Sequence, residues 1–464
     1  MFTHQQMQSN SKSGYGNPMA PAFVLAATFL LVASANAFQG PCDIYAKAGT
    51  PCVFATSTTR ALYDTFGGPL FQVRDSASMK TKDIYPISRG GIVNKASIDS
   101  FVKGKGSISL LYDQSPQKNN LPPSPRCNYL EAGLESNLAN GQTKLDGHAV
   151  MGIYITGATP ADIWASQRIK NVAYRNNAPK GIAKGNQAES MYMVMDGKRY
   201  SEPCCFSYGN GETTGNDDGN GTMEALYWGT NVSWGGPGQG SGPWVAADLE
   251  NGMYKSNMGG HTSSVTSPQN KTLNVTFASL FLKGPAADTF GLKAGDAQAG
   301  KLTTMWNGKR PTPSYYPKKL QGAIFLGTGG DGSPGGTGTF YEGVMTIGNP
   351  PDSVDDLVQA NIVAAGYGRA TSSLRSIGLP LSAAHLVASS TGAVVEYDLP
   401  ASGTATLEIS DLRGGRVATI HEGMVGAGAH RIAWNAAKTL PGVYVARLLL
   451  DGVDGWAGRV LVGR

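Results

Sequence analysis

The sequence predicts an all-β protein, in which a large β-sandwich of jelly-roll or concanavalin-like type precedes a small immunoglobulin-like β-sandwich. Three observations predict this class. The 464 residues include 62 glycines, and Ser, Thr and Asn crowd the segments between apolar runs, as in proteins with many turns. Only 15% of the residues are charged, against roughly 25% in an average soluble protein. Strand-like runs also follow one another without intervening helices, which is typical of sandwiches.

Strands and loops dominate the prediction for the segment 38–368. Runs that alternate in polarity, or that are rich in β-branched and aromatic residues, are bounded by Gly, Pro, Asn or Asp. These runs are 150–155, 191–195, 273–282, 323–326 and 340–347.

One helix is predicted in this segment. Ser353 and Asp356 form an S-x-x-D capping box, and Gly366 is a suitable stop. Apolar residues at helical spacing predict a buried face made of Val354, Leu357, Val358 and Ile362.

The pattern of apolar and turn residues changes after residue 368. Residues 369–379 lack periodicity and are predicted to be a linker. Short strand patterns then recur at near-regular spacing up to the end, which predicts an immunoglobulin-like sandwich over 380–464. The expected strands are 394–399, 404–409, 416–421, 430–434, 443–450 and 459–462.

Residues 1–37 are predicted to be a signal peptide. The apolar run 22–33 is short for a membrane span, and Ala35-Asn36-Ala37 supplies a small-x-small cleavage site. Lys12 is the only basic residue before the run, so an uncleaved membrane anchor remains the alternative. No other segment is long and apolar enough to cross a bilayer. We therefore expect a secreted, extracellular protein with no membrane partner after cleavage.

Charge and motif patterns argue against several functional classes. The formal net charge of +5 is small, and Lys and Arg are scattered rather than clustered, so no nucleic-acid partner is expected. The glycine-rich run 327–332 lacks the Lys-Ser/Thr pair and the following helix of a nucleotide-binding loop. No CxxC motif or nearby His pair suggests zinc. We predict neither a metal nor a cofactor.

The five cysteines fit an oxidising compartment. Cys42 and Cys52 would close a short loop by a disulfide. Cys204 and Cys205 are adjacent, with Cα atoms about 3.8 Å apart across a trans peptide, below the usual disulfide range of about 4.4–6.8 Å. Spacing alone therefore favours a bond from one of them to Cys127, with a bond between the neighbours as the alternative.

Two acidic positions are candidates for chemistry. Asp248 and Glu250 follow an apolar run, and strand alternation would place both side chains on one face. Paired carboxylates raise each other's pKa and would be costly in a core, so a wet concave face is expected. A plain solvated strand face is the alternative. Asp331 lies among glycines that would let a ligand approach closely, although a simple hairpin turn has the same pattern.

Aromatic residues close to the Asp248–Glu250 segment could stack on a sugar ring, although aromatic side chains more often belong to the core. They are Tyr227, Trp228, Trp234 and Trp244.

Ordered sequence blocks over nearly all of 40–368 resemble glycoside hydrolase family 54, the fungal-type α-L-arabinofuranosidase B enzymes. Among them are Cys204-Cys205-Phe206, Asp248-Leu249-Glu250-Asn251 and Gly329-Gly330-Asp331. The others are 40–45, 57–63, 112–115, 174–177, 223–225 and 339–345.

The resemblance implies a secreted, retaining, exo-acting α-L-arabinofuranosidase. It would remove side groups from arabinoxylan, arabinan or arabinogalactan, so its partner would be a plant cell-wall polysaccharide. Glu250 matches the nucleophile and Asp331 the general acid/base. Retention requires these carboxyl groups about 5–5.5 Å apart.

The resemblance also assigns other positions. It makes Cys204–Cys205 a disulfide that lines the sugar pocket, which reverses the preference from spacing. Three acids of the matching blocks, Asp113, Glu224 and Glu342, are interpreted as structural. The positions that match substrate-binding residues are Asp248, Asn251, Gly330, Cys204, Cys205 and Trp234.

The C-terminal part departs from this family, whose fungal members end in an arabinose-binding β-trefoil. Segments 440–448 and 459–462 resemble the C-terminal sorting or FlgD-like sandwich domains of bacterial secreted enzymes. That resemblance implies a contact with export machinery and attachment to the cell surface. A plain spacer domain is the alternative.

Two other functions stay open at the sequence level. A non-catalytic carbohydrate-binding sandwich would keep the fold without needing both Glu250 and Asp331. A related exo-glycosidase would act on β-xylosides or galactofuranosides, because furanose pockets accept near-isosteres.

Overall fold

The computed structural model describes residues 39–157, 168–202, 204–258 and 264–370 of the N-terminal part. In the C-terminal part it describes 385–389, 392–399, 403–411, 415–426, 428–437, 439–450 and 453–462. The predicted signal peptide and most of the predicted linker lie outside these residues. Strands make up 48% of the structure and helices 9%, which confirms the all-β class. Within the described residues, no helix has the length and hydropathy needed to span a bilayer.

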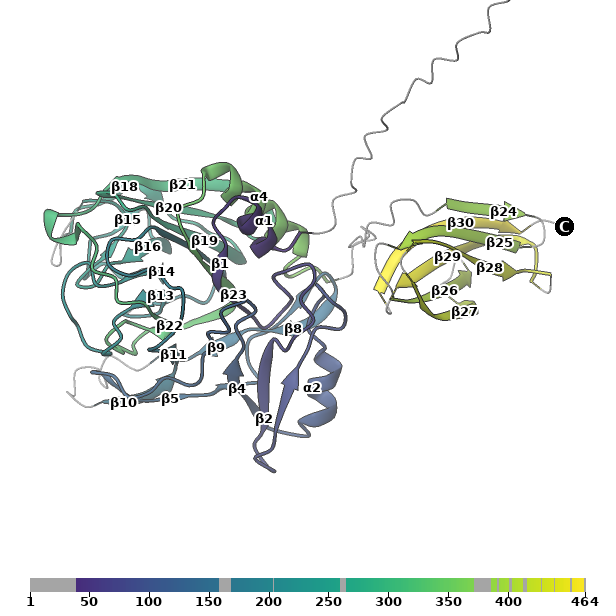
Figure 1. Cartoon of the computed structure of the whole chain (residues 1–464), viewed down its shortest axis with the longest axis horizontal. Coiled ribbons are helices and arrows are strands. Elements are labelled where there is room, and N and C mark those ends of the chain that lie inside the picture. The colour runs from purple at the N-terminus through teal and green to yellow at the C-terminus, as the bar shows by residue number, and fades with distance from the viewer. Residues whose placement is uncertain are drawn as a thin grey trace, which may run out of the picture. The chain divides into compact units, whose positions relative to one another are not determined.

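Two large antiparallel sheets form the main sandwich (Figure 1). The first has the order β1-β23-β12-β19-β20-β21, with β9 also paired to β23. Its strands are β1 (Cys52–Ser57), β9 (Ile153–Ile155), β12 (Glu189–Asp196), β19 (Phe277–Gly284), β20 (Thr289–Asp296), β21 (Ala299–Lys309) and β23 (Gly338–Ile347).

The second sheet has the order β11-β22-β13-β14-β16-β17. Its strands are β11 (Tyr174–Asn176), β13 (Ser207–Gly211), β14 (Glu224–Gly229), β16 (Trp244–Asp248), β17 (Met253–Tyr254) and β22 (Ala323–Thr328).

The main core lies between these two sheets. Tyr208 of β13 packs on Phe340 of β23, with ring centroids 5.3 Å apart, and on Phe54 of β1 at 6.3 Å. All residues of β14, β16 and β22 are buried, so both faces of the second sheet are covered where these strands run.

Smaller sheets complete the N-terminal part. A four-stranded sheet has the order β3-β2-β4-β6, and the pairs β5–β10, β7–β8 and β15–β18 are separate. Their strands are β2 (Phe71–Asp75), β3 (Thr81–Ile84), β4 (Gly106–Leu111), β5 (Leu130–Leu134), β6 (Ser136–Asn137), β7 (Gln142–Leu145), β8 (His148–Met151), β10 (Ile169–Val172), β15 (Gly238–Gln239) and β18 (Ser267–Lys271).

The helix prediction needs three corrections. The predicted helix is α4 (Asp352–Ala365), and Gly366 ends it in the left-handed conformation as expected. Its N-cap, however, is Pro351 rather than Ser353, and Leu357 is 58% exposed rather than core-facing. Two further helices, α1 (Pro41–Lys47) and α2 (Lys95–Phe101), were not predicted because seven residues are too few to display a helical period. A 3₁₀ turn, η1, spans Pro313–Tyr315.

The C-terminal part forms the predicted small sandwich. A three-stranded sheet, β24-β25-β28, accompanies a four-stranded sheet, β27-β26-β29-β30. Its own core includes Val395, Leu407, Ile432 and Trp434. The strands are β24 (His385–Ser389), β25 (Gly392–Leu399), β26 (Gly403–Asp411), β27 (Arg416–Val425), β28 (Gly428–Asn435), β29 (Gly442–Leu450) and β30 (Val453–Val462).

Candidate active site

Four carboxyl groups interact at the second sheet of the main sandwich. Asp248 is the last residue of β16, and Glu250 lies in the turn that follows. Asp331 lies in the loop between β22 and β23, and Glu212 directly follows β13. Burial raises the pKa of Glu250 most, and the charges of Glu212, Asp248 and Asp331 raise it further, so the four groups form one electrostatic cluster.

A tight turn positions Glu250. Glu250 and Asn251 have φ values of 63° and 55°, and the Leu249 N–H donates to the Gly252 carbonyl at 3.1 Å. The strand therefore ends at Asp248, and the expected strand alternation between Asp248 and Glu250 is wrong. Non-glycine residues with positive φ are uncommon and are concentrated at functional sites.

The glycine-rich loop folds back onto β13. A Cβ on Gly211 would lie 3.5 Å from the Gly330 Cα, so the two glycines are in close approach. Within the loop, both the backbone N–H and the hydroxyl of Ser333 donate to Asp331 Oδ1, at 2.9 and 2.7 Å. These bonds orient the Asp331 carboxyl.

Burial is the main cause of the pKa shifts in the cluster. It raises the pKa of Asp248 to about 7, although the Ser207 hydroxyl, which donates to Oδ2 at 2.8 Å, opposes the shift. Burial also raises the pKa of Asp331, and its hydrogen bonds from Ser333 oppose that shift. Asp331 is partly exposed, whereas Asp248 and Glu250 are only 5% and 6% exposed. Groups of this kind hold protons nearer neutral pH, as acid–base chemistry requires.

The adjacent cysteines lie beside the Asp331 loop. Cys204 and Cys205 form a disulfide, so the pairing with Cys127 that spacing favoured is wrong. Cys204 Sγ lies 4.0 Å from Ser333 Oγ. Trp234 packs in the same cluster as both cysteines. Cys127 is a buried free thiol.

Cys42 and Cys52 form the other disulfide, with an S–S distance of 2.03 Å, and join α1 to β1.

Asn251 and Gly330 are held by hydrogen bonds in the structure. Asn251 Nδ2 donates to Asp217 Oδ1 at 3.1 Å, and an Nη1–H of Arg175 donates to the Gly330 carbonyl at 2.5 Å. These bonds orient both residues at the site. Their contacts with a sugar stay a prediction.

Sequence reasoning missed three residues of this site: Arg175, Glu212 and Asp217. Asp217 contacts Asn251, and its charge raises the pKa of Asp331. Arg175 also donates to the Glu212 carbonyl. The only local signal for Glu212 is the preceding Gly-Asn-Gly segment, which opens the backbone as the glycines around Asp331 do.

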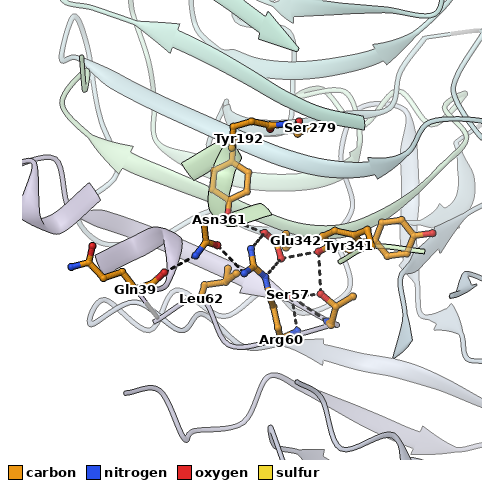
Figure 2. A network of polar contacts seen from close by, with 12 residues as sticks. Gln39, Ser57, Arg60, Leu62, Tyr192, Ser279, Tyr341, Glu342 and Asn361 are labelled. Atoms are coloured by element: carbon orange, nitrogen blue, oxygen red, sulfur yellow. Dashed lines mark hydrogen bonds and ion pairs between the residues drawn. The ribbon is translucent and has the colours of Figure 1, made fainter. Parts of the chain in front are cut away.

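The acids interpreted as structural have structural partners. Arg310 and Lys318 pair with Glu224 in the interior, the latter at 2.9 Å. Asp113 accepts the backbone N–H groups of Ala55, Ser115 and Asn119. Glu342 pairs with Arg60, as Figure 2 shows.

Three of the four aromatic candidates belong to the core. Tyr227 and Trp228 are fully buried and Trp244 is 3% exposed. Only Trp234 keeps part of its surface open.

The family described as "Alpha-L-arabinofuranosidase B, catalytic" matches residues 41–368. The chain belongs to this family. The match covers the main sandwich and all four carboxyl groups of the cluster, and it stops before the C-terminal sandwich.

Curated relatives agree with this membership. A probable α-L-arabinofuranosidase B of Aspergillus fumigatus is 44% identical over 360 residues, which cover 75% of this chain and 66% of the relative. A probable α-L-arabinofuranosidase B of Aspergillus clavatus is 38% identical over 457 residues, 94% of this chain and 84% of the relative. The chain thus spans slightly less than two thirds of the first relative's length.

Solved structures are similar as well. A family 54 α-L-arabinofuranosidase soaked with a cyclic sulfate inhibitor superposes with a TM-score of 0.66 at 35% identity, covering 79% of this chain and 70% of that one. An arabinofuranosidase complexed with arabinofuranosyl-α-1,2-xylobiose has the same TM-score and coverage at 34% identity.

Proposed function

We propose that this protein is a secreted, retaining, exo-acting α-L-arabinofuranosidase, with Glu250 as the nucleophile and Asp331 as the general acid/base. The observation that carries the proposal is the group of acids at the second sheet: burial first, and then the charges of Glu212, Asp248 and Asp331, raise the pKa of Glu250, and the loop of Asp331 lies beside the Cys204–Cys205 disulfide. Family membership supports the chemistry.

In the first step the Glu250 carboxylate attacks the anomeric carbon of the arabinofuranosyl group. Asp331 donates its proton to the glycosidic oxygen as the bond breaks, so the leaving alcohol departs neutral. Burial raises the pKa of Asp331, which favours the protonated form that this step requires.

In the second step the ionised Asp331 removes a proton from water. The water oxygen attacks the anomeric carbon and releases Glu250 as a carboxylate, so arabinose leaves with retained configuration. Asp331 regains its proton and the cycle closes.

The proposed substrates are arabinofuranosyl side groups of plant polysaccharides such as arabinoxylan, arabinan or arabinogalactan. The sugar in the similar complex, arabinofuranosyl-α-1,2-xylobiose, supports this class. Asp248, Asn251, Gly330 and Trp234 would contact the sugar. The Cys42–Cys52 disulfide and the predicted signal peptide are consistent with secretion.

The test measures hydrolysis of an aryl α-L-arabinofuranoside and of an arabinoxylan fragment. Glu250→Gln should lower kcat by roughly 10³-fold or more on both. Asp331→Asn should slow the natural glycoside far more than the activated aryl one, because a good leaving group needs little acid assistance. Asp99→Asn, on the exposed surface of α2, serves as the control. Wild-type activity in both site variants would refute the proposal and favour a binding module.

A second candidate activity is hydrolysis of β-xylosides. A relative from Trichoderma koningii named "Arabinofuranosidase/B-xylosidase" is 43% identical over 337 residues, which cover 71% of this chain and 63% of the relative. The same assay with an aryl β-D-xyloside measures this activity. If kcat/KM for the β-xyloside exceeds kcat/KM for the arabinofuranoside, β-xyloside hydrolysis becomes the first proposed activity.

We further propose that the C-terminal sandwich is a sorting domain that contacts export machinery. Its short resemblance to bacterial sorting domains supports this role, and the family match ends before it begins.

A further inference from the structure

Trp234 lies in a short segment, 231–236, that is tied to β17. The backbone N–H of Met253 donates to the Trp234 carbonyl. A Cβ added to the next residue, Gly235, would lie only 2.6 Å from the Met253 carbonyl oxygen, so the two backbones are in close approach. The Trp234 side chain packs in one apolar cluster with Cys204 and Cys205. The place of this ring beside the disulfide therefore depends on how the segment is held.

A buried lysine bridges the start of this segment and β17. Lys255 directly follows β17 and is 0% exposed. Its Nζ donates to the Asn231 carbonyl at 2.7 Å and to the Met253 carbonyl at 3.1 Å. Hydrogen bonds from a charged donor are stronger than those between neutral groups. The segment is thus fixed twice, at Asn231 by the Lys255 side chain and at Trp234 by the Met253 backbone.

Lys255 is itself fixed to the sheet that carries the acids. Asn270 of β18 donates from Nδ2 to the Lys255 carbonyl at 3.0 Å and to the Val245 carbonyl at 2.9 Å. Val245 lies on β16, the strand that ends at Asp248. A chain of hydrogen bonds therefore joins the Trp234 segment, through Lys255, to the strand that ends in the cluster of acids.

Its partners distinguish Lys255 from the other buried lysines. Those three, Lys283, Lys293 and Lys318, form ion pairs with acids. Within the residues that the structure describes, Lys255 forms no ion pair, and its Nζ donates to backbone carbonyls instead. Burial lowers the pKa of Lys255 to about 7, and the charge of Asp248 opposes this shift. A lysine buried without a carboxylate in contact is costly, and departures of this kind are expected at functional sites.

We propose that Lys255 is a positioning residue for sugar binding. It holds the segment 231–236 against β17, and the segment presents Trp234 to the sugar beside the Cys204–Cys205 disulfide. This inference rests on the proposed function, because it requires Trp234 to contact the arabinofuranosyl group.

The proposal predicts a change in binding rather than in chemistry. The printed bonds of Lys255 reach the backbone of the Trp234 segment and of β17, and the reacting carboxyl groups belong to Glu250 and Asp331. An interaction that is equally strong with substrate and transition state changes KM and leaves kcat unchanged. Loss of Lys255 should therefore raise KM.

The experiment is a mutant cycle between Lys255 and Trp234 on an aryl α-L-arabinofuranoside. Lys255→Met keeps an unbranched side chain and removes the N–H donors, so KM should rise about tenfold with kcat within about threefold of wild type. Trp234→Ala should raise KM at least as much. The double variant should match Trp234→Ala, because Lys255 acts through Trp234 and the two effects are not additive.

Lys293→Met is the matched control. Lys293 is also buried, at 5% exposed, but lies on β20 of the first sheet and pairs with Asp355 at 3.4 Å. This variant should lose stability and keep KM within about twofold of wild type. An equal rise in KM in the control would mean that any buried lysine has the same effect, which would overturn the inference.

Three further results would overturn the role of Lys255. They are an unchanged KM in Lys255→Met, a fall in kcat alone, and a full effect of Lys255→Met in the Trp234→Ala background. If Lys255→Met does not fold, Gly235→Ala displaces the same segment, since its Cβ would press on the Met253 carbonyl. That variant should raise KM about fivefold, and only when Trp234 is present. An unchanged KM there would also overturn the inference.

The two proposals fail differently. A wild-type rate in Glu250→Gln would refute the proposed function itself. An inactive Glu250→Gln together with a wild-type KM in Lys255→Met would refute only the role of Lys255. A wild-type KM in Trp234→Ala would refute the contact of Trp234 with the sugar, and the role of Lys255 with it.

Discussion

At the scale of single residues, Asp248 shows how burial controls the site. It lies at the end of β16 with the Ser207 hydroxyl on one oxygen, and its pKa is about 7. An aspartic acid in an unfolded chain titrates near roughly 3.9. The folded protein therefore holds a proton between these two pH values that the unfolded chain has released.

Asp248 should make the protein less stable as pH rises from 4 to 7. Its folded pKa is raised, so its contribution to stability is complete below about pH 4 and is lost as pH passes 7. Asp248→Asn stays neutral at every pH and should remove this loss. With about 1.4 kcal/mol per pKa unit, the variant should gain a few kcal/mol over wild type at pH 8 and nothing at pH 4.

Denaturant unfolding of both proteins at the two pH values measures this difference. A constant difference between the proteins at pH 4 and 8 would show that Asp248 does not hold the proton.

At the scale of elements, a buried polar network joins β1, β23, β12 and α4 (Figure 2). Arg60, which follows β1, donates from Nε and Nη2 to the two oxygens of Glu342, both at 2.7 Å. Tyr192 and Asn361 join the network from β12 and α4, with the Tyr192 hydroxyl donating to Glu342 and Asn361 accepting from Arg60. Two-oxygen contacts of this kind fix geometry as well as charge.

Breaking this pair should strongly destabilise the sandwich. Glu342→Leu leaves the Arg60 charge buried and unpaired, which should lower the free energy of unfolding by about 3–5 kcal/mol. Adding Arg60→Met should recover part of the lost free energy of unfolding, because no unpaired buried charge then remains.

A double-mutant cycle by denaturant unfolding gives the coupling energy of Arg60 and Glu342. The exposed pair Arg126–Glu131, 3.5 Å apart, is the control and should show less than about 1 kcal/mol. Additive effects at Arg60 and Glu342 would contradict the prediction.

At the scale of the whole molecule, the two largest hydrophobic clusters among the described residues come from different segments of the chain. The main core draws its residues from the segment 42–367, whereas the C-terminal core draws its residues from 393–462. The four carboxyl groups of the site all belong to the first segment. Each sandwich therefore buries its own apolar surface.

A chain that ends at residue 370 should keep its activity on an aryl arabinofuranoside, with kcat and KM within about twofold of the full chain. Calorimetry of the full chain should show two unfolding transitions, one for each core. If the C-terminal sandwich is a sorting domain, the shortened chain should also remain unattached in the native host. Loss of aryl activity would mean that the C-terminal sandwich supports the site.

The sequence by itself determined the strand content and the small C-terminal sandwich, because alternation and turn residues are local signals. It also singled out Asp248, Glu250 and Asp331, since a carboxylate between apolar residues or among glycines is visible without a structure. The family resemblance then supplied their predicted roles.

Only the tertiary structure decided how these groups meet. The positive φ of Glu250 belongs to a local turn between Leu249 and Gly252, which the alternation pattern of the sequence does not reveal. The structure contains the Cys204–Cys205 disulfide that the family resemblance implied, and not the pairing with Cys127 that spacing favoured. Glu212 lies 38 positions before Glu250 in the sequence. It belongs to the site because β13 and β16 lie in the same sheet. Contacts between distant segments arise from packing, and local patterns do not record them.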